Sequence, residues 1–219
     1  MHILYYILSS YGLIALIIIL STLLNKKGVM GSEGSRKFIH IGVANWYFLA
    51  LIFIEDPNDF WWLIIPPISF VVLNYISYKK QLISSMERDG KGNMGTVYYP
   101  IALLVVLILS FRVFNNSYLG LMGVMIMGYG DGLAAVIGSK YGKKDIGNGK
   151  TLLGVLTMFV VSLITATTIV MILDGIAYLW IGLIIALIAT LIEYITPKGL
   201  DNLSVPIVST LLYYVLLMI

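Results

Sequence analysis

One segment of the chain, 128–154, combines a carboxylate, many glycines and a group of lysines. Asp131 stands among glycine and alanine residues, which allow a neighbouring backbone or a bulky ligand to come close. Thr151 then opens an apolar run, and a helix N-terminus attracts anions through its free N–H groups and partial positive charge. The lysines between them are Lys140, Lys143, Lys144 and Lys150. This combination predicts a site for a polyphosphate.

The common soluble nucleotide-binding motifs do not fit this segment. The Gly-Lys-Thr sequence at 149–151 ends like a P-loop, but the position of the earlier glycine is occupied by Lys144. Gly128 and Gly130 begin like a dinucleotide-binding fingerprint, but its third glycine position holds Leu133. We therefore expect a polyphosphate site outside both soluble folds.

Further polar residues occur in other parts of the chain. Arg36 and His40 are four residues apart, so they lie on one side of a helix. His40 alone is typical of a membrane interface, whereas a buried carboxylate such as Glu193 is costly in a membrane and marks a functional site. The other candidates are Lys37, Asn93, Thr96, Asp201 and Asn202.

The elements that position these residues are expected to be membrane-spanning helices. Of the 219 residues 59% are hydrophobic and 11% charged, whereas soluble domains carry about 25% charged residues. Because a spanning helix needs about 20 apolar residues, we expect a single all-α polytopic domain over 1–219 with about eight transmembrane helices. The apolar runs cover about 3–24, 38–54, 60–78, 97–114, 118–137, 151–173, 176–196 and 203–219. The absence of cysteine excludes disulfides and thiolate metal sites.

The charges between the runs predict the orientation, because Lys and Arg accumulate in cytoplasmic loops. All of the 14 basic residues except Arg112 fall in the first, third, fifth and seventh gaps. Both termini are therefore expected outside, and the candidate residues are expected on the cytoplasmic face of the membrane. In a prokaryote this membrane would be the cell membrane. A helix entering from Tyr118 would place Asp131 about 20 Å from the outer surface, since each residue adds about 1.5 Å.

Five motifs identify a resemblance to a known family. They are SRKFIH (35–40), GNMGTVYYP (92–100), GDGLAAVIGSKYG (130–142), GKTLLG (149–154) and LIEYITPKGLDNLSVP (191–206). In this order and spacing they resemble the CTP-dependent lipid alcohol kinases, which include phytol kinase, dolichol kinase and yeast-type diacylglycerol kinase. The resemblance covers about 35–206 as the catalytic region, and it is strongest from Gly128 to Gly154.

The resemblance implies transfer of the γ-phosphoryl group of CTP, with Mg²⁺, to the hydroxyl of a membrane lipid alcohol. Because Mg²⁺ prefers one or two carboxylates, Asp131 is expected as the first metal ligand, with Glu193 or Asp201 as the second. These three are the metal candidates, and the catalytic candidates are Asp131, His40 and Glu193. Either Asp131 or His40 would take the proton of the alcohol. The nucleotide-binding candidates are Arg36, Lys37, Asn93, Thr96, Lys140, Lys143, Lys144, Lys150, Thr151, Asp201 and Asn202.

Two other functions remain open from the sequence. A more distant similarity connects the chain to the phosphatidate cytidylyltransferases, but those end in a longer run with further Asp and Arg residues, whereas 199–203 is only GLDNL. The other alternative is a membrane transporter or a scaffold without chemistry. A transporter would place ionisable groups near the bilayer midplane, whereas here they gather at one face. The expected partners are CTP, a lipid alcohol and the bilayer, without a nucleic acid; the acceptor and a homo-oligomeric state are left open.

Overall fold

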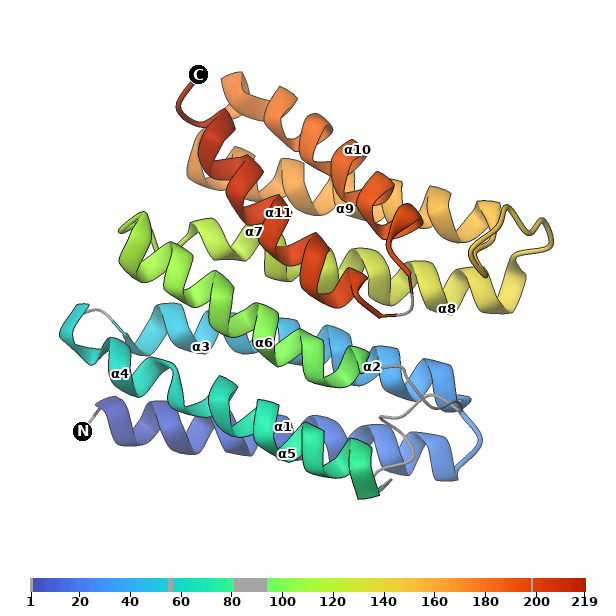
Figure 1. Ribbon diagram of the computed structural model, residues 1–219, viewed down its shortest axis with the longest axis horizontal. Helices are drawn as coiled ribbons and strands as arrows, with labels where there is room; N and C mark the ends of the chain where they lie inside the picture. Colours follow the sequence, from blue (N-terminus) through green and yellow to red (C-terminus); the bar gives the residue numbers. More distant parts are fainter. Residues whose placement is uncertain (1, 55–56, 81–93, 198) are drawn as a thin grey trace.

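The computed structural model describes residues 2–54, 57–80, 94–197 and 199–219, and every regular element within these ranges is helical (Figure 1). This confirms the all-α class. The first helices are α1 (His2–Lys26), α2 (Ser32–Ala44), α3 (Trp46–Phe53), η1 (Pro57–Asp59), α4 (Phe60–Leu63), α5 (Ile65–Lys80), α6 (Gly95–Ile108) and η2 (Leu109–Val113). The remaining ones are α7 (Leu119–Met125), η3 (Ile126–Asp131), α8 (Gly132–Tyr141), α9 (Leu152–Leu173), η4 (Ile176–Tyr178), α10 (Leu179–Ile195) and α11 (Asp201–Leu216).

Within the described residues, six helical segments are long and apolar enough to cross a membrane, so the chain is a multi-pass membrane protein. They are His2–Lys26, Phe60–Lys80, Gly95–Val113, Leu119–Tyr141, Leu152–Leu173 and Ile176–Ile195. The expected run 38–54 is divided between α2 and α3 at Asn45, and the run 203–219 corresponds to α11, which has 16 residues. The count of eight spanning helices therefore stays a prediction.

The helices lie roughly alongside one another, so their ends gather at two opposite ends of the bundle (Figure 1). The N- and C-termini lie at the left in this view, whereas the connections from α1 to α2 and from α8 to α9 lie at the right. Both of these connections carry basic residues. The grouping agrees with the charge pattern of the sequence, and the side of the membrane that each end faces remains a prediction.

The centre of the bundle is the continuous segment formed by α7, η3 and α8. All residues of α7 are buried, and η3 is a π-helical turn that ends at Asp131. Such wider turns interrupt α-helices frequently at functional sites. A Cβ atom at Gly128 would lie 2.3 Å from the Cβ of Ala44, and one at Gly132 would lie 2.6 Å from Ile41. Only glycine therefore allows α2 to approach η3 and α8 so closely.

Candidate active site

Asp131 lies buried between η3 and α2. Its side chain accepts a hydrogen bond from the ammonium group of Lys37, and both residues are only 3% exposed. His40, one turn further along α2, places Nε2 3.8 Å from Oδ2 of Asp131. A buried carboxylate is tolerated when a cation compensates its charge, which Lys37 does here. The structure thus brings Asp131, Lys37 and His40 together.

A second ion pair lies at the C-terminal end of α10. The ammonium group of Lys150 donates hydrogen bonds to both the carboxylate and the backbone carbonyl of Glu193, and it lies 4.0 Å from Oδ2 of Asp201. The loop that carries Lys150 is hydrogen-bonded to the same C-terminal end of α10. Tyr194 donates its hydroxyl hydrogen to the carbonyl of Ile146 at 2.8 Å, and the side-chain amide of Asn148 donates to the carbonyl of Tyr194 at 3.1 Å.

The two ion pairs bring three carboxylates together. Asp131, Glu193 and Asp201 each offer an oxygen, and these three oxygens lie within 4.8 Å of one another. Burial raises the pKa of Asp201, and the negative charge of Asp131 raises this pKa further. Since a divalent cation would relieve this repulsion, and since carboxylates are the ligands that Mg²⁺ prefers, the donor set fits such an ion.

A polar cavity of about 380 Å³ opens beside the carboxylates. It is lined by residues of α2, η3, α8, α9, α10 and α11 and of the loop before α9. Thr151 lines it at the start of α9, where its hydroxyl oxygen accepts a hydrogen bond from the N–H of Gly154 at 3.2 Å. The charged residues lining this cavity are Glu33, Arg36, Lys37, Asp131, Lys150, Glu193 and Asp201. Its charges and volume suit an anionic ligand with a bound cation.

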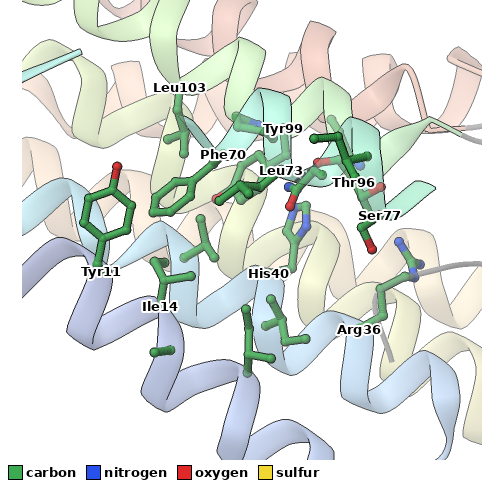
Figure 2. Close-up of a pocket in the computed structure, with 18 residues that line it drawn as sticks. Tyr11, Ile14, Arg36, His40, Phe70, Leu73, Ser77, Thr96, Tyr99 and Leu103 are labelled. Carbon is green, nitrogen blue, oxygen red and sulfur yellow. Dashed lines mark hydrogen bonds between the residues drawn. The ribbon is translucent and has the colours of Figure 1, made fainter. Parts of the chain in front are cut away.

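An apolar cavity of about 460 Å³ adjoins the polar one (Figure 2). Residues of α1, α2, α5 and α6 form most of its wall, and Arg36 and Asn202 line both cavities. Figure 2 shows Arg36 and Thr96 at one side of the apolar cavity and Tyr11 at the other. The hydroxyls of Tyr11 and Ser69 form a hydrogen bond of 2.7 Å, which links α1 to α5 at the far side. The apolar cavity is suited to a hydrocarbon chain.

The structure brings most of the predicted site residues together, but not all of them. Those lining the polar cavity are Arg36, Lys37, Asp131, Lys150, Thr151, Glu193, Asp201 and Asn202. Thr96 and His40 line the apolar cavity instead. Lys140, Lys143 and Lys144 are exposed and do not line either cavity in the part of the chain that the structure describes. Asn93 lies outside the described residues.

Sequence reasoning missed two residues of the site. Glu33 pairs with Arg36 at 2.5 Å, and their spacing of three residues on a helix was a signal for an ion pair. Tyr99 stacks on His40 with ring centroids 4.0 Å apart. Tyr99 belongs to the motif 92–100, where it follows Tyr98, and the sequence does not indicate which of these two tyrosines faces inward.

Comparison with known proteins agrees with this arrangement. The chain is 26% identical to phytol kinase of Synechocystis, over 90% of this chain and 84% of that relative. It is 29% identical to probable phytol kinase 1, chloroplastic, of rice over 83% of this chain, and it spans 64% of that protein. Identity to phytol kinase 1, chloroplastic, of Arabidopsis thaliana is 26%, over 87% of this chain and 69% of the relative. No protein-family profile and no solved structure matches. The resemblance to the lipid alcohol kinases seen in the motifs is thus confirmed by similarity to phytol kinases over most of the chain.

Proposed function

We propose that this protein transfers the γ-phosphoryl group of CTP to the hydroxyl of a membrane lipid alcohol, either an isoprenoid alcohol such as phytol or a polyprenol, or diacylglycerol. The observation that carries the proposal is the contact between the two cavities. A cavity lined by carboxylates and cations adjoins an apolar cavity at Arg36 and Asn202. Phosphoryl transfer requires mainly positioning and charge neutralisation, and this arrangement provides both.

The polar cavity is the proposed nucleotide site. Asp131, Glu193 and Asp201 would hold Mg²⁺, which neutralises charge on the triphosphate when bound. Lys37 and Lys150 now pair with two of these carboxylates. With Mg²⁺ held by the carboxylates, Lys37 and Lys150 would be free to bind phosphate oxygens of the nucleotide. Lysine suits this exchange because its flexible stem carries a point charge.

The apolar cavity is the proposed site of the lipid chain. Arg36 lines both cavities, but its positive charge is already paired with the carboxylate of Glu33. A neutral alcohol avoids the cost of desolvating a charged head group in such a place. The alcohol would therefore lie with its chain toward Tyr11 and its hydroxyl toward the carboxylates.

His40 is the proposed acceptor for the proton of the alcohol. Asp131 is the other candidate for this role, but its carboxylate already accepts a hydrogen bond from Lys37. His40 Nε2 is buried without a hydrogen-bond partner among the described residues. As the bond between the alcohol oxygen and the γ-phosphorus forms, the bond to the leaving nucleoside diphosphate breaks, and the proton passes to the imidazole.

Labelled nucleotide tests the reaction directly. Purified protein in liposomes receives Mg²⁺, an isoprenoid alcohol or diacylglycerol, and CTP labelled at either the α- or the γ-phosphorus. With γ-labelled CTP the lipid should become labelled. With α-labelled CTP the lipid should remain unlabelled. Asp131→Asn serves as the inactive control. If phosphatidate instead takes up the α-label and none of the alcohols takes up the γ-label, the chain is a cytidylyltransferase and the proposal is wrong.

A further inference from the structure

Two polar atoms in the wall of the apolar cavity are buried without a hydrogen-bond partner in the described part of the chain. They are Nε2 of His40 and the hydroxyl oxygen of Tyr99, whose residues are 7% and 4% exposed. Nearly all buried polar groups in proteins are paired, because an unpaired one costs about 1–3 kcal/mol. The coincidence of two such atoms on stacked rings therefore requires an explanation.

Both rings lie where the two cavities approach each other. His40 rises from α2 and Tyr99 reaches down from α6, so their rings stack at an interplanar angle of 14° (Figure 2). Both residues line the apolar cavity, whereas Asp131, only 3.8 Å from His40 Nε2, lines the polar cavity. The stacked pair thus forms part of the partition between the proposed lipid and nucleotide sites.

The chemistry of the two atoms matches a single hydroxyl group. The Tyr99 hydroxyl donates one hydrogen bond, and Nε2 of His40 accepts one when the ring proton is on Nδ1. An alcohol oxygen needs a donor, and its hydrogen needs an acceptor. A lipid phosphate would instead require several donors or cations, which these two atoms do not supply.

We propose that Tyr99 and His40 form the receiving site for the hydroxyl group of the acceptor lipid. Tyr99 donates to the acceptor oxygen, and His40 accepts a hydrogen bond from the acceptor O–H group. This assignment rests on the proposed kinase function and adds to it the two residues that hold the hydroxyl group of the neutral acceptor lipid. Tyr99 thereby becomes a substrate-binding residue rather than only a packing partner for His40.

Thermal shifts in detergent test the site without requiring turnover. The probes are a C20 isoprenoid alcohol and the corresponding hydrocarbon without the hydroxyl. In the wild type the alcohol should raise Tm more than the hydrocarbon does. In Tyr99→Phe this difference should disappear, whereas Tm without lipid should not fall, because the hydroxyl that is removed has no partner to lose.

Tyr47→Phe is the matched control. Tyr47 is also buried, but its hydroxyl donates to the carbonyl of Ser117 at 2.8 Å, so this variant should have a lower Tm and keep the preference for the alcohol. In the kinase assay, Tyr99→Phe should raise KM for the alcohol about 10-fold, as loss of one hydrogen bond does, while KM for CTP stays unchanged.

The outcomes separate this proposal from the kinase proposal. If the wild type shows no preference for the alcohol over the hydrocarbon, or if Tyr99→Phe keeps that preference, the receiving site is wrong. If the preference behaves as expected but no alcohol is phosphorylated, the site binds hydroxyl lipids and only the kinase function fails. If alcohols are phosphorylated and Tyr99→Phe has normal KM values, the kinase function stands and the role of Tyr99 is overturned.

Discussion

The ammonium group of Lys37 and the carboxylate of Asp131 are in contact although 94 residues separate them in the chain. Both are buried, so removal of one charge leaves the other uncompensated, at a cost of about 3–5 kcal/mol. Asp131→Asn should therefore lower both activity and Tm. Activity should fall at least ~100-fold, as it does when a main charge-stabilising group is lost.

A double variant separates these two effects. Asp131→Asn combined with Lys37→Met removes both charges, and Tm measured in detergent should return toward the wild-type value. Activity should remain at least ~100-fold below that of the wild type. Near-normal turnover of the double variant would show that neither residue belongs to the catalytic machinery.

Metal dependence provides a second prediction. Glu193→Gln should raise the Mg²⁺ concentration for half-maximal activity on the order of 10-fold, because the proposed site would lose one of its three carboxylate ligands. Asp174→Asn is the control. Asp174 accepts a hydrogen bond from Tyr213 at 2.5 Å and lies outside the polar cavity, so it should affect Tm and not the Mg²⁺ requirement. Equal Mg²⁺ curves for wild type and Glu193→Gln would contradict the metal site.

The lysines of the loop region should differ in their effects on nucleotide binding. Lys150 lines the polar cavity, whereas Lys143 is exposed and does not. Lys150→Gln should raise KM for CTP at least ~10-fold at all salt concentrations, since ion pairs that are partly buried are screened little. Lys143→Gln should change KM by less than ~3-fold, and only at low salt. Similar KM values for both variants would argue against Lys150 as a phosphate ligand.

The far wall of the apolar cavity should limit the length of the acceptor chain. Tyr11 contacts Phe70 edge-on with ring centroids 5.6 Å apart and forms a hydrogen bond with Ser69. Tyr11→Ala should open this wall and improve kcat/KM for prenols longer than C20 relative to C10. Tyr11→Phe keeps the ring and should keep the wild-type profile. An unchanged profile in Tyr11→Ala would mean that the chain leaves the cavity by another route.

Labelling of single cysteines tests the orientation in the membrane, since the chain has no cysteine of its own. Lys143→Cys and Ile176→Cys place exposed thiols on connections at opposite ends of the bundle (Figure 1). The charge pattern predicts that an impermeant reagent reaches position 176 in intact cells and position 143 only after the membrane is opened. The reverse result would invert the predicted topology.

Sequence alone predicted the carboxylates and their cations because ionisable residues are rare in apolar runs. Asp131 and Glu193 could be singled out in this way, whereas Lys150 was assigned as one of the lysines in the glycine-rich loop before Thr151, and the structure places all three around one cavity. The exposed Lys140 and Lys143 were assigned to the same site because spacing in a glycine-rich loop does not reveal which side chains turn inward. That distinction depends on the contacts of the loop with α10.

The apolar cavity and the π-helical turn could not be predicted from the sequence. Most of the cavity wall comes from four helices, and side chains such as Phe70 and Leu103 have the same apolar character as residues that face lipid. The wider turn at η3 lies where α2 packs closely against Gly128 and Gly132, a tertiary contact that the local sequence does not show. Tyr99 was missed for the same reason, since its importance follows from its stack on His40.

The partition between the two cavities has a kinetic consequence. Among the described residues, the linings of the two cavities share Arg36 and Asn202 and are otherwise separate, so on the proposed function neither substrate must leave before the other enters. Steady-state rates should therefore follow a random-order ternary-complex law, with intersecting rather than parallel double-reciprocal lines. Label should not exchange between CDP and CTP unless the alcohol is present, because in the proposed reaction the phosphoryl group would pass directly from one substrate to the other.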